Sequence, residues 1–206
     1  QRPFRSVHHT VTKAALIGGG MIPRPGEISL AHGGVLYLDE LAEFQRPVLE
    51  VLRQPLEERC VHLSRRNGNY EFPANCMLVA AMNPCPCGNY PDVEKCSCTP
   101  GQIQHYLGKI SQPFLDRIDI CAEAPRTEYE MLGKTGGTTS AQMREMVCCA
   151  RRVQAERYRG TEIRWNSMLG VKELDLYCKL GKEEKKLMEK AFHSLGLTAR
   201  TYHKIL

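Results

Sequence analysis

The stretch Gly33–Phe44, GGVLYLDELAEF, places two adjacent carboxylates directly after an apolar run. The run at 35–38 is continuously apolar and does not alternate with polar residues, which is typical of a strand buried inside a parallel sheet. Burying an unpaired carboxylate is costly, so Asp39 and Glu40 should be exposed at the strand end, salt-bridged or facing a metal ion. The stretch therefore predicts an α/β fold with charged groups at one edge of its sheet.

An apolar strand that ends in Asp-Glu has the form of a Walker B element. In such an element the Asp, here Asp39, holds the Mg²⁺ of a bound nucleoside triphosphate, and the Glu, here Glu40, polarises the attacking water. The alternative is a plain strand end that runs into a helix N-terminus, where carboxylates interact favourably with the helix dipole. Both interpretations stay open from this stretch alone.

A second apolar run, CMLVAAM at 76–82, predicts a neighbouring core strand that ends at Asn83. Ligands of a parallel sheet bind beyond the carboxyl ends of its strands. Asn83 should therefore lie beside Asp39 and Glu40, where its amide could orient a water or a γ-phosphate. The dipeptide Asn-Pro is also a common turn signal, so the placement carries this prediction and the residue type does not.

A third core strand is expected at 118–124, IDICAEA, and Arg117 directly precedes it. Arg117 is either surface charge paired with a neighbouring Asp or an arginine finger that reaches the nucleotide of an adjacent subunit. The remaining elements expected in this part are loops at 1–32 around a short helix at 12–17, a helix opened by Pro47 and ended by Pro55, a hairpin around Asn67-Gly68, and a helix with capping-box spacing at Thr99 and Gln102.

From about Thr127 the sequence changes to an all-helical pattern. Thr139 and Gln142 repeat the capping-box spacing, and the helix they open carries one apolar face: Met143, Met146, Val147, Ala150 and Val153. Two more helices are expected around 171–180 and 183–195, with Gly196 as a stop and a last helix from Thr198. We therefore expect an α/β part at 1–126 and a helical part at 127–206.

Composition and charge describe a globular chain of 206 residues with a net charge of +5. Residues 144–206 carry 14 Lys and Arg against 8 Asp and Glu. This surplus suits an anionic partner such as nucleic acid, although a solvated helical surface has the same pattern. No stretch approaches the roughly 20 apolar residues of a membrane helix. Several of the ten cysteines fall inside expected strands and helices, which favours reduced thiols and a cytoplasmic protein.

Four cysteines form two Cys-x-Cys pairs in one expected loop: Cys85, Cys87, Cys96 and Cys98. Four thiolates so close in sequence could bind Zn²⁺ tetrahedrally as a structural site. They could also be free thiols in a surface loop, or disulfides formed on oxidation. The histidines His8, His9 and His32 lack spaced carboxylates or cysteines nearby, so we expect them to be loop and core residues.

Long strings of the chain resemble one family, the magnesium-chelatase-like AAA+ ATPases of the ComM/YifB type. The strings are RPFRSVHHT, GGGMIPRPGEISLAHGGVLYLDEL, VLEVLRQPLEE, FPANCMLVAAMNPCPCG, LDRIDI and TARTYHKIL, and together they cover nearly the whole chain. The resemblance implies Asp39 and Glu40 as Walker B, Asn83 as sensor 1, Arg117 as arginine finger and Arg200 as sensor 2. It also implies a partial AAA+ P-loop NTPase core followed by a helical lid.

The chain departs from the family pattern in two ways. Val7 replaces the usual Pro, which is minor, and no Walker A sequence is present. The only Gly-Lys-Thr, Gly133-Lys134-Thr135, lacks the first glycine of the motif, because residue 128 is Glu. In the family the Walker A loop lies upstream of RPFR. We therefore expect the chain to be part of a longer protein that hydrolyses ATP with Mg²⁺, and the chain alone to be inactive.

The resemblance further implies a ring of identical subunits, in the family a hexamer, because an arginine finger acts on the neighbouring site. Relatives of the ComM type act on DNA as branch-migration motors in natural transformation, and the basic helical part is compatible with that. Two alternatives remain. One is a chelatase motor that remodels a protein partner so that Mg²⁺ enters a porphyrin. The other is a binding module without enzymatic activity, built around a zinc loop.

Overall fold

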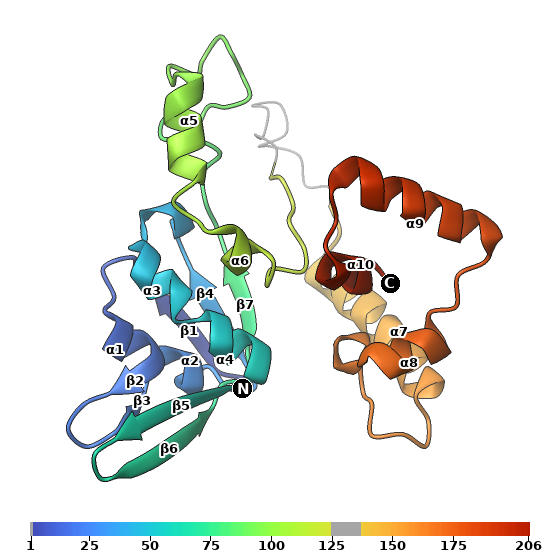
Figure 1. Ribbon diagram of the computed structural model, residues 1–206, viewed down its shortest axis with the longest axis horizontal. Coiled ribbons are helices and arrows are strands. Elements are labelled where there is room, and N and C mark those ends of the chain that lie inside the picture. The colour runs from blue at the N-terminus through green and yellow to red at the C-terminus, as the bar shows by residue number, and fades with distance from the viewer. Residues whose placement is uncertain (1, 125–136) are drawn as a thin grey trace. The chain divides into compact units, whose positions relative to one another are not determined.

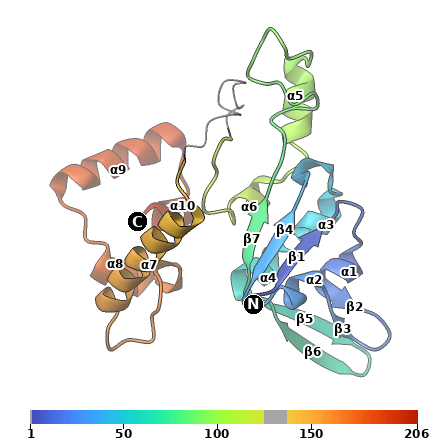
Figure 2. The same ribbon diagram turned by 180° about the vertical axis from the view of Figure 1, so that it is seen from behind.

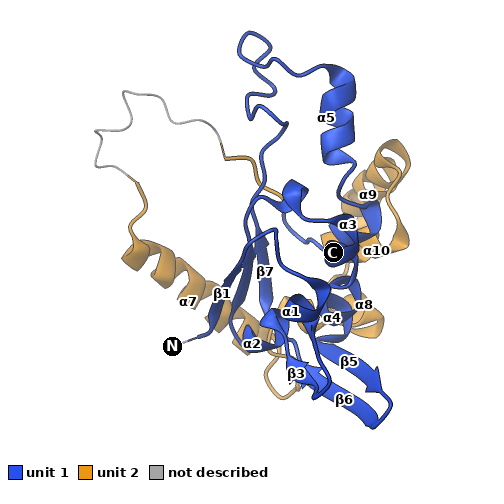
Figure 3. Cartoon of the chain, turned by 90° about the vertical axis from the view of Figure 1, so that its left-hand side faces the viewer, with its two compact units in different colours: residues 1–120 blue, residues 121–206 orange. Residues whose placement is uncertain are grey.

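The computed structural model describes residues 2–124 and 137–206. The chain divides into two compact units, residues 1–120 and 121–206 (Figure 3). The domain boundary expected at 126/127 and the Gly133-Lys134-Thr135 sequence lie outside the described residues. That boundary stays a prediction, and each unit is described by itself.

A three-stranded parallel sheet forms the centre of the first unit. Its strands are β1 (Phe4–Val7), β4 (Val35–Leu38) and β7 (Met77–Ala80), in the order β1-β4-β7. Both pairings are parallel, with Val7 opposite Leu38 and Leu38 opposite Ala80. The α/β fold and the strands β4 and β7 are confirmed. All three strands consequently end at one edge of the sheet.

The third strand differs from the one that the sequence predicts. Residues 1–32 were expected to be loops around a helix, but Phe4–Val7 pair with β4. Residues 118–124 were expected to be the third core strand, but they form no strand, and Ile120 is 84% exposed. Among the described residues β7 pairs only with β4, so its outer edge carries no further strand and the run at 118–124 joins no ladder.

The polar residues of β1 are the reason that its strand character is hidden. Arg5 donates from its guanidinium to both carboxylate oxygens of Glu27, with one Nη2–Oε1 distance of 2.8 Å. Glu27 begins α2 (Glu27–Leu30), and its hydrogen bonds and charge raise the pKa of Arg5 above its ordinary value. The ion pair stabilises a charged residue within the sheet that a pattern of apolar residues alone does not predict.

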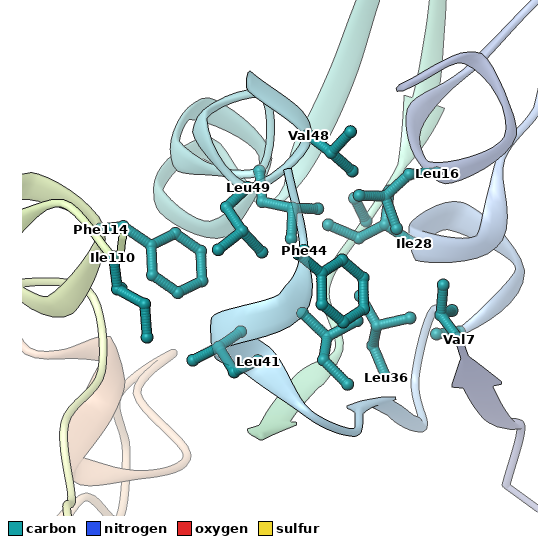
Figure 4. Packing of buried hydrophobic residues seen from close by; sticks show 14 of the residues in the cluster. Val7, Leu16, Ile28, Leu36, Leu41, Phe44, Val48, Leu49, Ile110 and Phe114 are labelled. Atoms are coloured by element: carbon teal, nitrogen blue, oxygen red, sulfur yellow. The ribbon is translucent and has the colours of Figure 1, made fainter. Parts of the chain in front are cut away.

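Four short helices cover one face of the sheet: α1 (Lys13–Ile17), α2, α3 (Arg46–Glu50) and α4 (Arg53–Glu58). They stand in front of the strands in Figure 1, and the strands stand in front of them in Figure 2. Between the two layers pack Leu16, Ile28, Leu36 and Leu49, all almost fully buried (Figure 4). Burying each such side chain contributes roughly 1.5–3 kcal/mol.

Burial in β4 alternates along the strand. Leu36 and Leu38 are fully buried against the helices, whereas Val35 and Tyr37 are only half-buried. The continuous apolar run had predicted burial on both faces. In the part of the chain that the structure describes, the face that carries Val35 and Tyr37 also carries exposed apolar residues, among them Phe4, whose ring stacks on that of Tyr37 at 6.2 Å.

The helices after β4 follow the prediction in part. Pro47 lies in the first turn of α3, as expected. Pro55 was expected to end this helix, but it lies in the first turn of α4, after a break at Val51 and Leu52. Proline is tolerated there because the first N–H groups of a helix have no partner within it. The expectation that Pro55 ends the helix was therefore wrong.

Two antiparallel ribbons and two helices complete the first unit. The ribbons are β2 (Gly18–Gly19) with β3 (Arg24–Pro25), and β5 (Cys60–Arg65) with β6 (Gly68–Pro73), which is the predicted hairpin. The 3₁₀ turn η1 (Leu41–Glu43) follows β4. The helices are α5 (Pro100–Leu107), whose capping box at Thr99 and Gln102 is confirmed, and α6 (Gln112–Leu115).

The second unit is helical in its described part. It contains α7 (Ser140–Arg157), the 3₁₀ turn η3 (Asn166–Met168), α8 (Val171–Tyr177), α9 (Lys182–Leu195) and α10 (Ala199–Ile205). The predicted cap at Thr139 and the stop at Gly196, with φ 60°, are confirmed. The apolar face predicted for α7 is exposed, with Met146 68% exposed. Among the described residues, no helix is both long and apolar enough to span a membrane.

Candidate functional site at the carboxyl edge of the sheet

The carboxyl edge of the sheet carries polar residues after each of the three strands. His8 and His9 follow β1, Asp39 and Glu40 follow β4, and Asn83 comes shortly after β7. The ladder between the last two strands continues past their ends, because the N–H of Leu41 donates to the carbonyl of Ala81 at 2.9 Å. The predicted residues Asp39, Glu40 and Asn83 are thus on one edge, and all three are exposed.

Glu40 has an unusual backbone conformation. Its φ of 52° and ψ of 49° lie in the left-handed region, which among the described non-glycine residues only Glu40 and Arg59 enter. This conformation costs roughly 1–2 kcal/mol for a residue with a Cβ. A hydrogen bond of 2.9 Å from the N–H of Glu40 to Oδ1 of Asp39 stabilises the turn. Backbone strain of this kind gathers at functional sites, which makes the turn a candidate site.

The turn at Glu40 separates charged from apolar side chains. The next residues, Leu41 and Ala42 in η1, are buried, whereas the Glu40 side chain remains 56% exposed. Asp39 lies two positions after Tyr37, and partial burial together with the Asp39 carboxylate raises the pKa of Tyr37. Two exposed carboxylates are oxygen ligands of the kind that Mg²⁺ prefers, so these residues fit a magnesium ion.

His9 is a site residue that the sequence analysis missed. Its Nδ1 lies 3.0 Å from Oε2 of Glu40, and the His8 ring lies 4.0 Å from the His9 ring. Both histidines were expected to be loop or core residues. The available signal was their position directly after Phe4–Val7, and it could not be used because this stretch was not predicted to be a strand.

Arg117 lies away from a strand and is engaged within the first unit. It follows α6, and its guanidinium donates to the carbonyl of Arg53 at 3.1 Å and to the Glu57 carboxylate at 2.6 Å, as well as to the carbonyl of Pro113. Its side chain is only 13% exposed. In this conformation Arg117 connects α6 to α4.

Arg200 belongs to the second unit. It is the second residue of α10, a helix whose first turn is capped by the Thr198 side chain, which accepts from the N–H of Thr201 at 3.2 Å. Thr198 was predicted to begin this helix, and the cap confirms it. Arg200 is thus fixed at a helix N-terminus.

The four cysteines of the two Cys-x-Cys pairs lie together. The Sγ atoms of Cys85, Cys87, Cys96 and Cys98 are all within 4.8 Å of one another, and all four residues are free thiols. A backbone N–H of Asn89 is the main cause that lowers the pKa of Cys87 to about 5. No disulfide joins these four cysteines in the described structure. The arrangement of their sulfur atoms fits a tetrahedral metal ion.

Comparison with known proteins assigns both parts of the chain to one family. Residues 1–132 match the family model described as magnesium chelatase, subunit ChlI. Residues 137–206 match the model of the C-terminal part of the same subunit.

Similarity to individual proteins agrees with these models. The chain is 49% identical to competence protein ComM of Haemophilus influenzae and 44% identical to YifB of Escherichia coli, in each case over 100% of the chain and 40% of the relative. It is 42% identical to Mb2921c of Mycobacterium bovis, over 80% of the chain and 33% of that protein. The chain thus spans well under half the length of these relatives. It belongs to the magnesium chelatase subunit ChlI family and is a homologue of ComM and YifB.

Proposed function

We propose that the intact protein is a Mg²⁺-dependent AAA+ ATPase and that the carboxyl edge of the sheet is part of its catalytic site. The observation that carries this proposal is the left-handed turn that exposes Glu40 beside Asp39 at the end of a parallel strand. Ligands of parallel sheets bind at this edge. Membership of the magnesium chelatase family supports the assignment.

The chemistry would be in-line attack of water on the γ-phosphate of ATP. Asp39 would hold Mg²⁺, and Glu40 and Asn83 would orient the attacking water. The 206 residues contain no Gly-x-x-x-x-Gly-Lys sequence to cradle the phosphates, so that loop would come from elsewhere in the intact protein. A structural Zn²⁺ would be additional to ATP and Mg²⁺ and would take no part in hydrolysis, because four thiolates leave no open position.

The two arginines would act across subunits and from the lid. Arg117 would serve as an arginine finger on the nucleotide of a neighbouring subunit, which requires a closed ring, in our proposal a hexamer. For this role its guanidinium must leave Glu57, with which it is now paired. Arg200, at the start of α10, would contact the phosphates as sensor 2. The domain boundary near 126 would separate the catalytic core from this lid.

DNA is the substrate that we propose for the motor, and the cytoplasm its location. The support is the relative named competence protein ComM and the surplus of basic residues at 144–206. A second candidate, remodelling of a protein partner for Mg²⁺ insertion into a porphyrin, is favoured by the family description. A third, a binding module without catalysis, would rest on the cysteine cluster alone.

The deciding experiment is ATP hydrolysis by the intact protein, with and without single-stranded and forked DNA. Glu40→Gln should lower hydrolysis by about 100-fold or more while nucleotide binding is retained, because the variant keeps the shape of the side chain and loses its basicity. Glu43→Gln is the matched control, since Glu43 is an exposed carboxylate three residues away that pairs with Lys109.

The outcomes separate the three functions. Hydrolysis that DNA stimulates and that Glu40→Gln abolishes supports the DNA motor. Hydrolysis that is indifferent to DNA at low salt, where phosphate contacts are strongest, favours the protein-remodelling motor. Hydrolysis that survives Glu40→Gln, or is absent from the intact protein, contradicts the catalytic role of the strand edge.

A further inference from the structure

Residues 81–99, between β7 and α5, contain neither helix nor strand. We name this segment the cysteine loop. Loops of this length without secondary structure are uncommon in compact domains. Most residues of the cysteine loop are exposed, yet Cys85 has no exposed surface. A small side chain is therefore fully buried in a segment that lacks an apolar core of its own.

The sulfur atoms around Cys85 have the spacing of ligands around one ion. Its Sγ lies 3.4 Å from that of Cys87 and 3.8 Å from that of Cys96, and the last two are 3.7 Å apart. Four sulfurs at about 2.3 Å from a central Zn²⁺ stand about 3.8 Å from one another. A disulfide would need about 2.05 Å. Iron–sulfur clusters of several iron atoms hold their cysteines farther apart than a single ion does.

Backbone turns present the two cysteine pairs to each other. Gly88, with φ 75°, adopts a left-handed conformation directly after Cys87, and its N–H donates to the carbonyl of Cys85 at 3.0 Å. After this turn, the N–H of Tyr90 donates to Sγ of Cys85 at 3.4 Å. Hydrogen bonds of this kind stabilise sulfur in its thiolate form, which is the form that binds metals.

The second pair is presented by a turn around Asp92. The Asp92 carboxylate accepts from the N–H groups of Glu94 and Lys95 at 3.1 and 3.3 Å, and its carbonyl accepts from the N–H of Cys96 at 2.8 Å. The side chain of Asn89 donates to the carbonyl of Lys95 at 3.0 Å, which connects this turn to the first one. Both halves of the loop are thus ordered around the sulfurs.

We propose that the cysteine loop binds one structural Zn²⁺ through Cys85, Cys87, Cys96 and Cys98. The four thiolates complete a tetrahedral shell and leave no position for a substrate. The ion connects the residues that follow β7, including Asn83, to Thr99, the N-cap of α5. It would order the loop in the way that a core orders a larger segment. The proposal goes beyond the ATPase and holds whether or not the protein hydrolyses ATP.

The experiment measures zinc and iron by mass spectrometry in the intact protein, purified under reducing conditions without chelator. We expect about one Zn²⁺ per chain. Cys85→Ser and Cys96→Ser should each weaken zinc binding by more than roughly 10–100-fold, because each removes a direct ligand. That range is the loss expected when only a residue that hydrogen-bonds to a ligand is removed. The control is the double variant Cys148→Ser/Cys149→Ser, in which two exposed thiols of α7 are removed and zinc should be retained.

Metal exchange gives a second test that does not depend on the folding of a variant. Zinc is removed from the wild-type protein with a chelator and replaced by Co²⁺, whose visible spectrum is diagnostic of tetrahedral thiolate ligation. A tetrathiolate spectrum supports the site. So does cleavage of the cysteine loop by a protease that becomes faster when the ion is removed. Iron in place of zinc, a disulfide within the loop, or four thiols that react with a thiol reagent as fast as Cys148 and Cys149 would overturn it.

Discussion

Nδ1 of His9 lies 3.0 Å from Oε2 of Glu40, so the residues that follow β1 and β4 are joined by a side-chain contact. The His9 side chain is 29% exposed, and its ring also meets that of Phe44 edge-on at 6.4 Å. The left-handed turn and the histidine contact both act on the carboxylate that we propose as the group that polarises water. A hydrogen-bond position of Glu40 is therefore occupied by the protein itself.

We expect His9→Ala to raise ATP hydrolysis of the intact protein in the absence of DNA. Removing the ring releases Glu40 from an exposed contact of this type, which is worth about 0.5–1 kcal/mol and corresponds to roughly a two- to fivefold increase. Steady-state hydrolysis with and without DNA is the measurement. His8→Ala is the control, because His8 contacts Thr10 and the His9 ring and makes no hydrogen bond to Glu40. A decrease in His9→Ala alone would show that the contact orients Glu40 productively.

Arg117 offers a test of action across subunits. Arg117→Ala should lower hydrolysis by about 1000-fold if the guanidinium is an arginine finger, whereas Glu57→Gln, which removes only its present carboxylate partner, should not lower it. Each of Arg117→Ala and Glu40→Gln should be inactive alone. Rings assembled from both should regain part of the activity, because some interfaces then combine an intact Glu40 with an intact Arg117.

A purely structural role of Arg117 predicts a different outcome. If Arg117 serves only to connect α6 to α4, the two variants at this ion pair will both be destabilised, by about 1–3 kcal/mol for a lost hydrogen bond to a charged group. Hydrolysis per folded molecule will then be unchanged in both, and mixed rings will show no recovery.

Two neighbouring glycines before β4 should differ in their tolerance to a methyl group. A Cβ on Gly34 would lie 1.8 Å from the carbonyl oxygen of Pro3, so Gly34→Ala must push β1 away from β4. We expect the free energy of unfolding to fall by more than about 2 kcal/mol. A Cβ on Gly33 meets nothing within 4 Å, and its φ of 71° alone should cost Gly33→Ala about 1 kcal/mol. Urea denaturation followed by circular dichroism compares the two; equal losses would contradict the steric explanation.

The fold could be predicted where a strand or cap has a local signal. The apolar runs of β4 and β7, the Asn-Gly hairpin and the Thr99 and Thr139 caps all depend on residues close in sequence. β1 was not predicted, because Arg5 and Ser6 interrupt its apolar pattern, and Glu27, which pairs with Arg5, lies 22 residues away. Residues 118–124 failed for a related reason: an apolar pattern cannot report whether a partner strand lies beside it.

The candidate site was likewise predictable only in the features that depend on residues close in sequence or on the ends of predicted strands. Asp39, Glu40 and Asn83 could be placed at one edge because parallel strands end together. The left-handed conformation of Glu40 could not be anticipated, since glutamate has no preference for it. The contact with His9 depended on β1, and the contact of Arg117 with Glu57 joins residues far apart in sequence. The cysteine pairs predicted a cluster, and their spacing in sequence left its geometry undetermined.

Ser111 and Glu50 should make stability depend on pH. The buried Ser111 hydroxyl donates to the Glu50 carboxylate and also caps α6, accepting from the N–H of Phe114 at 3.3 Å. The Ser111 hydrogen bond, followed by that of Arg53, holds the pKa of Glu50 below its ordinary value. A lowered carboxyl pKa stabilises the folded state above the unfolded pKa of about 4.3, and this contribution is lost as the pH falls through the folded pKa.

We therefore expect Ser111→Ala to lower the free energy of unfolding by about 1–3 kcal/mol at pH 7, from the lost cap and the lost charged hydrogen bond. The difference from wild type should shrink as the pH falls below the ordinary carboxyl pKa of about 4.3 and through the lowered pKa of Glu50, because Glu50 is then protonated in both proteins. Glu50→Gln keeps an acceptor for Ser111 and cannot ionise. In that background Ser111→Ala should lower the free energy of unfolding by the same amount at pH 7 and at acidic pH. Urea denaturation of the wild type, the two single variants and the double variant at pH 7 and at acidic pH measures these free energies. If Ser111→Ala lowers the free energy of unfolding of the wild type equally at both, the hydroxyl acts only as a helix cap.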